Sequence, residues 1–250
     1  MKSIYTLFFL LLIGSSCKER PFHKNSSKSE TLHISEHLSL DDSIEHYITP
    51  FRTHLNKTLD STLAFAPETY SKKDGDLNTA IGNFMADVVY ELGNPIFKSR
   101  STFDIDGVLL NHGGIRSVIS KGPISARTAF EVMPFENSIV VAALKKEQMT
   151  ELLAYLKSQN KAHPIANMEV VLGASNQIKS FKVNSKPLED KTYYIATSDY
   201  LANGGDSMDF FIKADTIYNT NYKIRNALID YFNKVDTIKP KIDNRFIKVN

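Results

Sequence analysis

The sequence has little of several features that define common protein classes. Its 250 residues contain a single cysteine, Cys17, so no disulfide can form within the chain. Basic residues outnumber acidic ones by only 30 to 28, without a block of like charge, which excludes the basic surface of a typical nucleic-acid-binding protein. A P-loop, a dinucleotide-binding fingerprint and a Ser-His-Asp grouping are also absent. The remaining composition, 42% hydrophobic and 23% charged, is that of a globular protein with a sizeable core.

A hydrophobic run long enough to span a bilayer is missing as well. The apolar stretch Ile4–Ile13 follows Lys2 and has only about the length of a signal-peptide core. Gly14–Ser16 and Cys17 follow directly and resemble a bacterial lipoprotein signal, although leucine is usual three residues before the cysteine. We therefore predict a signal peptide at residues 1–16 and a lipid on Cys17 that anchors the protein in the bacterial cell envelope, on its periplasmic or surface face. An ordinary secretory signal with an incidental cysteine is the alternative.

The rest of the chain divides into a tether and one domain. Residues 17–40 carry scattered charges with little apolar periodicity, which predicts a flexible tether. The domain is expected over residues 41–250, and its first helix should begin near Asp41–Ser43 because acidic residues favour a helix N-terminus. Helices and strands mix there without strict βαβ alternation. The predicted fold class is therefore α+β, with a mixed β-sheet packed with helices.

Apolar spacing predicts the individual elements. A helical period predicts helices at 41–55, 79–92, 125–130, 146–156 and 222–232, with Asn78 or Thr79 as the cap of the second. Apolar or alternating runs predict strands at 61–65, 108–110, 138–144, 168–172, 178–183, 194–197 and 244–249. Pro50 should kink the first helix, and Gly93–Pro95 should end the second.

Two segments combine a strand end, a Gly-Gly pair and polar side chains. The apolar run Val108–Leu110 leads into Asn111–Arg116, and a strand ending at Thr197 leads into Asp199–Asp206. Glycine permits positive φ and close approach of a ligand, and a strand end is a common place for a small molecule. Arg116 adds a fixed fork of donors for hydroxyl, carboxylate or phosphate oxygens. A tight turn explains either segment alone, but the two together predict opposite walls of one pocket.

Four ordered motifs resemble the C-terminal domain of the 5'-nucleotidase family, which includes UDP-sugar hydrolases and related metallophosphoesterases. The motifs are Ala80–Asp87, Asn111–Arg116, Gly122–Ile124 with Met133–Phe135, and Asp199–Asp206. The resemblance extends from about Asp41 to the C-terminus. In that family this domain holds the nucleoside, and a separate N-terminal domain carries two metals and the phosphate chemistry. The resemblance implies the same α+β fold here.

The resemblance also implies roles for the pocket residues. Phe135 and Tyr200 would clamp a nucleobase, where the family has phenylalanine at both positions, and stacking contributes about 1–3 kcal/mol per base. Asn111 would face the base edge, and Arg116 and Asp206 would suit the ribose oxygens. The predicted substrate-binding residues are Asn111, Gly113, Gly114, Arg116, Phe135, Tyr200, Asn203, Gly205 and Asp206. Alternatively, the two aromatic side chains belong to the core and Asn203 organises its turn.

One family position departs from the pattern. Many members have a substrate-binding arginine five residues before the glycine that matches Gly82, and this chain has Leu77 there. Contact with phosphate or ribose would then be weaker or come from elsewhere, with Arg127 as a candidate.

The family's metal centre has no counterpart in this sequence. A dimetal phosphoesterase holds two metals about 3.5–4 Å apart. The family's Asp-x-His, Gly-Asn-His-Asp/Glu and Gly-His-x-His segments are all absent. We therefore expect no catalytic residue, metal or cofactor in this chain, and divalent metals only in a partner.

Three functions remain open from the sequence. The first is a nucleoside- or nucleotide-binding subunit that acts in nucleotide catabolism with a separately encoded metallophosphatase domain, and is not catalytic alone. The second is a non-catalytic nucleotide-binding surface lipoprotein. The third is a degenerate copy that mediates surface interactions, and the aromatic pair with Arg116 argues against it.

Overall fold

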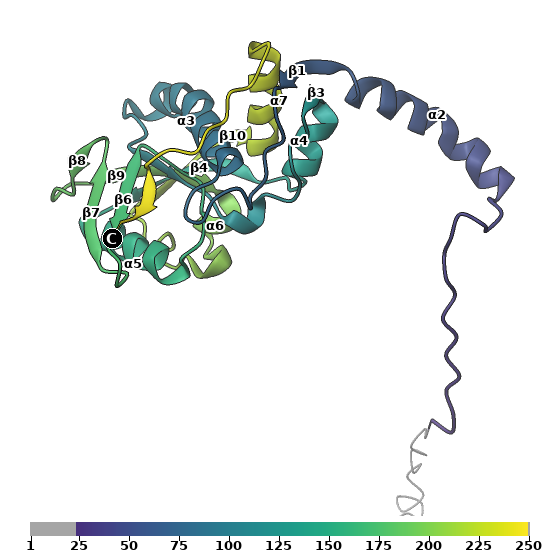
Figure 1. Ribbon diagram of the computed structural model, residues 1–250, viewed down its shortest axis with the longest axis horizontal. Helices are drawn as coiled ribbons and strands as arrows, with labels where there is room; N and C mark the ends of the chain where they lie inside the picture. The colour runs from purple at the N-terminus through teal and green to yellow at the C-terminus, as the bar shows by residue number, and fades with distance from the viewer. Residues whose placement is uncertain (1–23, 250) are drawn as a thin grey trace, which may run out of the picture. The chain divides into compact units, whose positions relative to one another are not determined.

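The computed structural model describes residues 24–249 (Figure 1). The predicted signal peptide and the lipidation site Cys17 therefore lie outside the described residues. The chain divides into two units, residues 1–48 and Thr49–Asn250. In the predicted tether, residues 24–40 include a turn at 35–38 and no helix or strand. Among residues 24–249, no helix combines the length and apolar character needed to cross a membrane.

Helices and strands follow one another in mixed order, which confirms the predicted α+β fold class. The helices are α2 (Asp42–Leu59), α3 (Ala80–Ser101), α4 (Ala126–Val132), α5 (Lys146–Gln159), α6 (Asp199–Ala202) and α7 (Ile224–Lys234), with 3-10 turns η1 (His112–Gly114) and η2 (Gly205–Ser207). The strands are β1 (Thr62–Ala66), β2 (Gly107–Leu109), β3 (Gly122–Ser125), β4 (Ser138–Leu144), β5 (Ile165–Ala166), β6 (Met168–Leu172), β7 (Ile178–Val183), β8 (Lys186–Pro187), β9 (Tyr193–Ser198), β10 (Thr216–Lys223) and β11 (Phe246–Lys248).

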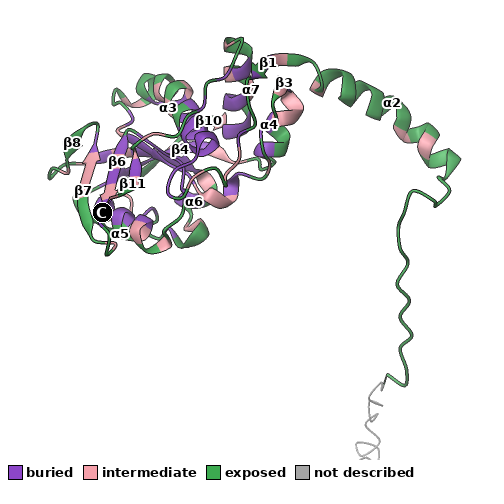
Figure 2. Ribbon diagram, in the orientation of Figure 1, coloured by how far each residue is buried: buried purple, intermediate pink, exposed green. Residues whose placement is uncertain are grey.

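The central five-stranded sheet has the order β10-β4-β9-β2-β5, and its inner strands β4, β9 and β2 are buried on both faces, whereas the edge strand β10 is mostly exposed or half-buried (Figure 2). Val108 of β2 joins a core with helices α3, α4 and α7, whereas its neighbour Leu109 joins a second core with α5. Such a sheet needs continuous apolar runs, which is what β4 has. Strands β2 and β9 pair in parallel, so their C-terminal ends lie at the same edge of the sheet. This pairing brings the two Gly-Gly segments together.

A second, four-stranded sheet has the order β11-β6-β7-β8. Its strand β11 pairs in parallel with β6, which confirms the strand predicted at 244–249. Phe246 of β11 is fully buried. The C-terminal segment is therefore part of the folded domain.

The prediction that Gly93–Pro95 ends the second helix is wrong. Thr79 caps α3 as predicted, and its hydroxyl accepts a hydrogen bond from the Gly82 amide at 3.2 Å. The helix nevertheless continues past Pro95 to Ser101. Buried Phe97 packs against the rings of two tyrosines, Tyr194 and Tyr218. This packing outweighs the backbone hydrogen bond that a proline removes.

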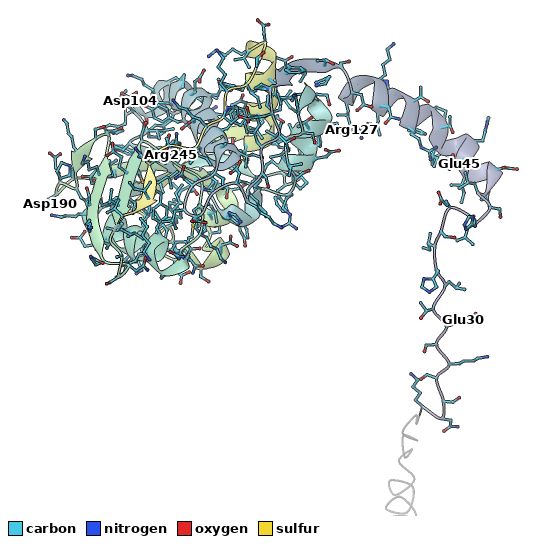
Figure 3. The ribbon with its side chains drawn as sticks, viewed as in Figure 1. Glu30, Glu45, Asp104, Arg127, Asp190 and Arg245 are labelled. Carbon is cyan, nitrogen blue, oxygen red and sulfur yellow. The ribbon has the colours of Figure 1, made fainter. Side chains whose placement is uncertain are left out.

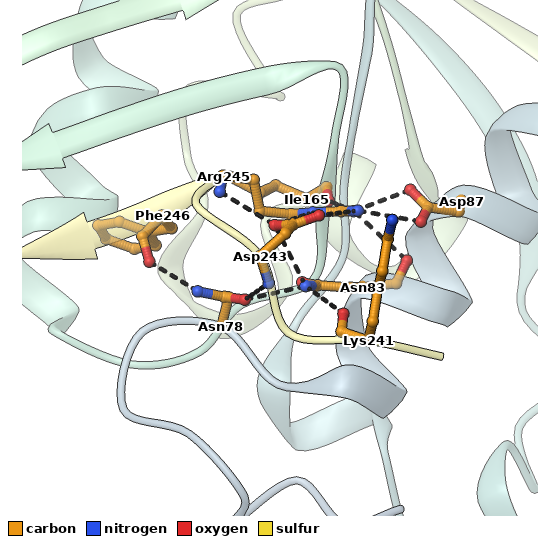
Figure 4. Close-up of polar contacts among 8 residues, drawn as sticks. All are labelled: Asn78, Asn83, Asp87, Ile165, Lys241, Asp243, Arg245 and Phe246. Atoms are coloured by element: carbon orange, nitrogen blue, oxygen red, sulfur yellow. Dashed lines mark hydrogen bonds and ion pairs between the residues drawn. The ribbon is translucent and has the colours of Figure 1, made fainter. Parts of the chain in front are cut away.

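A polar cluster fastens the C-terminal segment to the start of α3 (Figure 4). We call it the Arg245 clamp and define it by Asn78, Asn83, Asp87, Asp243 and Arg245. The Arg245 guanidinium donates to both carboxylates, at 2.8 Å to Asp87 and 2.7 Å to Asp243. Asn78 donates to the backbone oxygen of Phe246 at 2.9 Å. Burial alone would raise the pKa of Asp243, but the hydrogen bonds from Arg245 outweigh it and hold that pKa below its usual value.

Candidate functional site

A cavity of about 310 Å³ lies where the segments after β2, α4 and β9 meet. Its lining residues are Asn111, Gly113, Gly114, Arg116, Phe135, Asn137, Tyr200 and Asp206. All the predicted binding residues line this cavity except Asn203 and Gly205. Asn203 instead donates to the backbone oxygen of Asp199 at 2.8 Å and so organises its turn. Asn137, which lies just before β4, was not among the predicted binding residues.

The carboxylate of Asp206 joins the two walls of the cavity. Its Oδ2 accepts a hydrogen bond from Asn111 Nδ2 at 2.7 Å, and its Oδ1 accepts one from the Tyr200 hydroxyl at 3.0 Å. Asp206 has a left-handed backbone with φ of 53°, which is uncommon for a residue other than glycine. The backbone oxygen of Asp206 accepts a further hydrogen bond from the Tyr155 hydroxyl at 2.9 Å. These contacts hold a negative charge at the cavity.

The two Gly-Gly pairs make room for side chains of the cavity itself. A Cβ on Gly114 would lie 2.7 Å from Asn111 Oδ1, so glycine lets the Asn111 amide lie across the turn. A Cβ on Gly205 would lie 2.5 Å from the Tyr200 ring, so glycine lets that ring lie beside the turn. Of these four glycines only Gly204 has positive φ, at 87°. Positive φ therefore explains only Gly204, whereas Gly114 and Gly205 are required for close packing.

Phe135 and Tyr200 are exposed by 42% and 47%, and both line the cavity. The alternative that these two aromatic side chains belong to the core is therefore wrong. The Arg116 guanidinium lies 5.8 Å from the centre of the Phe135 ring and donates to the Gly113 backbone oxygen at 3.3 Å. The cavity therefore has a positive guanidinium next to an aromatic face, as well as the carboxylate of Asp206.

Behind the cavity lie two groups that the sequence reasoning missed. His163 is buried and its ring packs edge-on against Tyr155 at a centroid distance of 5.4 Å. Burial disfavours the charged imidazolium and lowers the pKa of His163 to about 4, although a hydrogen bond with the Leu110 backbone acts in the opposite direction. Burial, followed by the negative charge of Asp206, raises the pKa of Tyr155 to about 12. Both groups are therefore neutral near pH 7. Tyr155 supports the Asp206 turn, and His163 accepts a hydrogen bond from the His112 amide at 3.3 Å.

Arg116 lines the cavity as predicted, but the candidate replacement for the family arginine does not. Arg127 lies on α4 (Figure 3). It donates to Asp60 and to Asn56 and does not line the cavity, so it does not replace the family arginine. Leu77, at the family's arginine position, is buried in the core that contains α5. Lys72, which the sequence reasoning missed, donates to the backbone oxygen of Ile115 at 2.8 Å. Burial and the nearby charge of Arg116 lower the pKa of Lys72.

The cavity combines two aromatic faces, amide groups, a guanidinium and a carboxylate. This set suits a ligand that has both a flat ring and hydroxyl groups. Aromatic faces stack on flat rings, and carboxylates accept hydrogen bonds from hydroxyl groups. Asp87, the last residue of the Ala80–Asp87 motif, does not line the cavity and binds Arg245. Within residues 24–249, no group of three or more His, Cys, Asp or Glu side chains is placed to hold a metal ion.

Comparison with known proteins identifies the family to which this chain belongs. Residues 58–213 match the family model described as "5'-nucleotidase, C-terminal domain". The chain is 24% identical to the trifunctional nucleotide phosphoesterase protein YfkN of Bacillus subtilis, with 90% of this chain and 16% of that protein covered. It is 25% identical to protein UshA of Yersinia enterocolitica, with 86% and 39% covered. The chain thus spans well under half the length of these two relatives.

Solved structures show the same fold. A 5'-nucleotidase precursor from Thermus thermophilus matches with a TM-score of 0.69 at 21% identity, over 84% of this chain and 43% of that one. The NAD nucleotidase of Haemophilus influenzae matches with a TM-score of 0.62 at 16% identity, over 86% and 43%. Because the family model covers more than half of the chain, this protein belongs to the 5'-nucleotidase C-terminal domain family.

Proposed function

We propose that the domain binds a nucleoside or nucleotide in the cavity between Phe135 and Tyr200. The observation that carries the proposal is the exposure of both rings on one cavity whose other groups are polar. A nucleobase would stack on the rings, Asn111 would face its edge, and Arg116 and Asp206 would contact ribose or phosphate oxygens. The relatives' printed names, which include a nucleotide phosphoesterase and 5'-nucleotidases, support this ligand class.

We further propose that the domain presents this ligand to a separately encoded metallophosphatase domain in nucleotide catabolism. Hydrolysis of this kind uses two metals to generate the nucleophile and to neutralise developing charge. The described residues offer no cluster for such metals, and the chain spans 39% of its UshA relative. The divalent metals are therefore assigned to the partner, and the chain alone should not turn over substrate. A non-catalytic binding lipoprotein is the competing function.

Lipid anchoring in the bacterial cell envelope completes the proposal. Its support is the Gly14–Cys17 pattern with a tether over residues 17–40. Cys17→Ala should release the protein from membranes or block its maturation, because multiple acyl chains anchor stably. Unchanged membrane fractionation together with a lack of metabolic lipid labelling would contradict the anchoring.

Two assays test the binding and the catalytic parts separately. Calorimetry with adenosine, AMP and UDP-glucose tests the ligand class, and failure of all three to bind would overturn the proposal. Hydrolysis of AMP and UDP-glucose with manganese or zinc is then measured for this chain alone and with a co-expressed metallophosphatase domain. Turnover only with both proteins supports the subunit function. Binding without any effect on the partner's activity, and without a complex in gel filtration, favours the non-catalytic lipoprotein.

A further inference from the structure

The hydroxyl group of Tyr200 has a role that the ring alone does not explain. It donates to Asp206 Oδ1 at 3.0 Å, while Asn111 Nδ2 donates to Asp206 Oδ2 at 2.7 Å. Both oxygens of the cavity's carboxylate are therefore engaged by side chains of the cavity itself. A hydroxyl bonded to a carboxylate is among the stronger hydrogen bonds in proteins, because the acceptor is charged.

Several independent features hold this hydroxyl in place. The Asp206 backbone amide donates to the same Tyr200 oxygen at 3.3 Å, so the hydroxyl both donates and accepts. Gly205 lacks the Cβ that would lie 2.5 Å from the ring. The left-handed backbone of Asp206, with φ of 53°, turns its carboxylate toward Tyr200 and Asn111, and Tyr155 holds its backbone oxygen. The contact is therefore a built feature of the turn.

We propose that the Tyr200 hydroxyl determines specificity, by taking the place of a ligand hydroxyl at Asp206. The inference rests on the proposed function. A ribose hydroxyl that takes the position of the Tyr200 hydroxyl on Asp206 Oδ1 exchanges one hydrogen bond for another of similar strength, so little affinity is gained. With phenylalanine at this position, the same oxygen would face water and gain a full ligand contact. This cavity should therefore discriminate weakly between nucleosides with and without the ribose 2'- and 3'-hydroxyls.

The test is a comparison of Tyr200→Phe with the unaltered protein. Phenylalanine keeps the stacking ring and removes only the hydroxyl. The probes are adenosine with 2',3'-dideoxyadenosine, and uridine with 2',3'-dideoxyuridine, measured by calorimetry. Tyr155→Phe is the matched control, because its hydroxyl binds the backbone oxygen of Asp206 and not the carboxylate.

The measured quantity is the ratio of the Kd of the dideoxynucleoside to the Kd of the nucleoside. We expect this ratio to lie within about threefold of one for the unaltered protein and to rise about tenfold in Tyr200→Phe, as one charged hydrogen bond would give. Tyr155→Phe should leave the ratio unchanged even if it weakens both ligands. An unchanged or lower ratio in Tyr200→Phe, with nucleosides still bound, overturns this inference alone. Failure of the unaltered protein to bind any of the four probes overturns the proposed function, and this inference with it.

Discussion

The cavity and the Arg245 clamp are both built from polar side chains, but they differ in burial and in what they bind. In the clamp, Asn78 and Asn83 are buried and the Arg245 side chain is only 15% exposed, although Asp87 at its edge is 53% exposed. Its guanidinium donates to two carboxylates and to the Ile165 backbone oxygen. In the cavity, Asp206 and both aromatic rings are exposed.

The difference follows from the cost of burying polar groups. A buried polar group needs a partner inside the chain, so the clamp's groups bind one another and hold the C-terminal segment. An exposed group keeps the ability to exchange its partner for a ligand. The clamp should therefore contribute to the free energy of unfolding, and the cavity to binding. The following changes test that separation, from the largest expected effect to the smallest.

Removal of the clamp's cation should give the largest loss of stability. Arg245→Ala removes the guanidinium that donates to Asp87, Asp243 and a backbone oxygen, while the amide of residue 245 still donates to Asp243, and should lower the free energy of unfolding by about 2–4 kcal/mol. Denaturant unfolding measures the change, and nucleotide affinity should stay the same. Lys98→Ala, which breaks an exposed pair with Asp104, is the control and should cost less than about 1 kcal/mol. Equal losses in the two variants would contradict the structural role of the clamp.

Acid should destabilise the protein through His163, behind the cavity. The folded pKa of about 4 lies below the usual value of 6.5, so the unfolded chain binds a proton that the folded chain does not. Stability from this group is therefore present above pH 6.5 and is lost as the pH falls to about 4, by about 3 kcal/mol in total. Unfolding of His163→Gln should lack this part of the pH dependence. Parallel stability curves for the two proteins between pH 7 and pH 4 would show that His163 is not the cause.

Gly205→Ala should separate binding from stability. Its Cβ would lie 2.5 Å from the Tyr200 ring, which can rotate out of the cavity at little cost to the fold. We expect nucleotide affinity to fall about tenfold, within the range for one stacked ring. Gly93→Ala is the control, because its Cβ would meet Ile139 at an ordinary 3.5 Å and should leave affinity unchanged. Wild-type affinity in Gly205→Ala would mean that the Tyr200 ring does not contact the ligand.

The smallest effect is expected at the start of α3. Thr79→Ala removes the hydroxyl that accepts from the Gly82 amide, and should lower the free energy of unfolding by about 1 kcal/mol. Thermal unfolding measures this change. A change in nucleotide affinity would indicate that α3 and the cavity are coupled, so that stability and binding are not separate.

The sequence was informative where local pattern decides the structure. The buried strand β4 has a continuous apolar run, and Thr79 caps α3 as its residue type predicts. The walls of the cavity were predictable because β2 and β9 are each followed by a segment that contains a Gly-Gly pair with polar neighbours. Parallel pairing of these two strands then brings both segments to one edge.

Structure set by distant packing could not be read from the sequence. Strand β10 was missed because its sequence is interrupted by asparagines, with an irregular register between Asn219 and Tyr222. The continuation of α3 past Pro95 depends on Phe97 packing against tyrosines from other strands. The hydrogen bond between Tyr200 and Asp206 depends on the left-handed backbone at Asp206, and no motif encodes it.

The most direct test of the central claim is the affinity for a nucleotide when one ring of the cavity is removed. Phe135→Ala is compared with Phe65→Ala, because Phe65 is equally exposed, at 43% against 42%, but does not line the cavity. Calorimetry with AMP should show binding weaker by about 1–3 kcal/mol for Phe135→Ala, as loss of a stacking ring predicts, and unchanged binding for Phe65→Ala. Equal affinities for the two variants and the unaltered protein would contradict the assignment of this cavity as the nucleotide site.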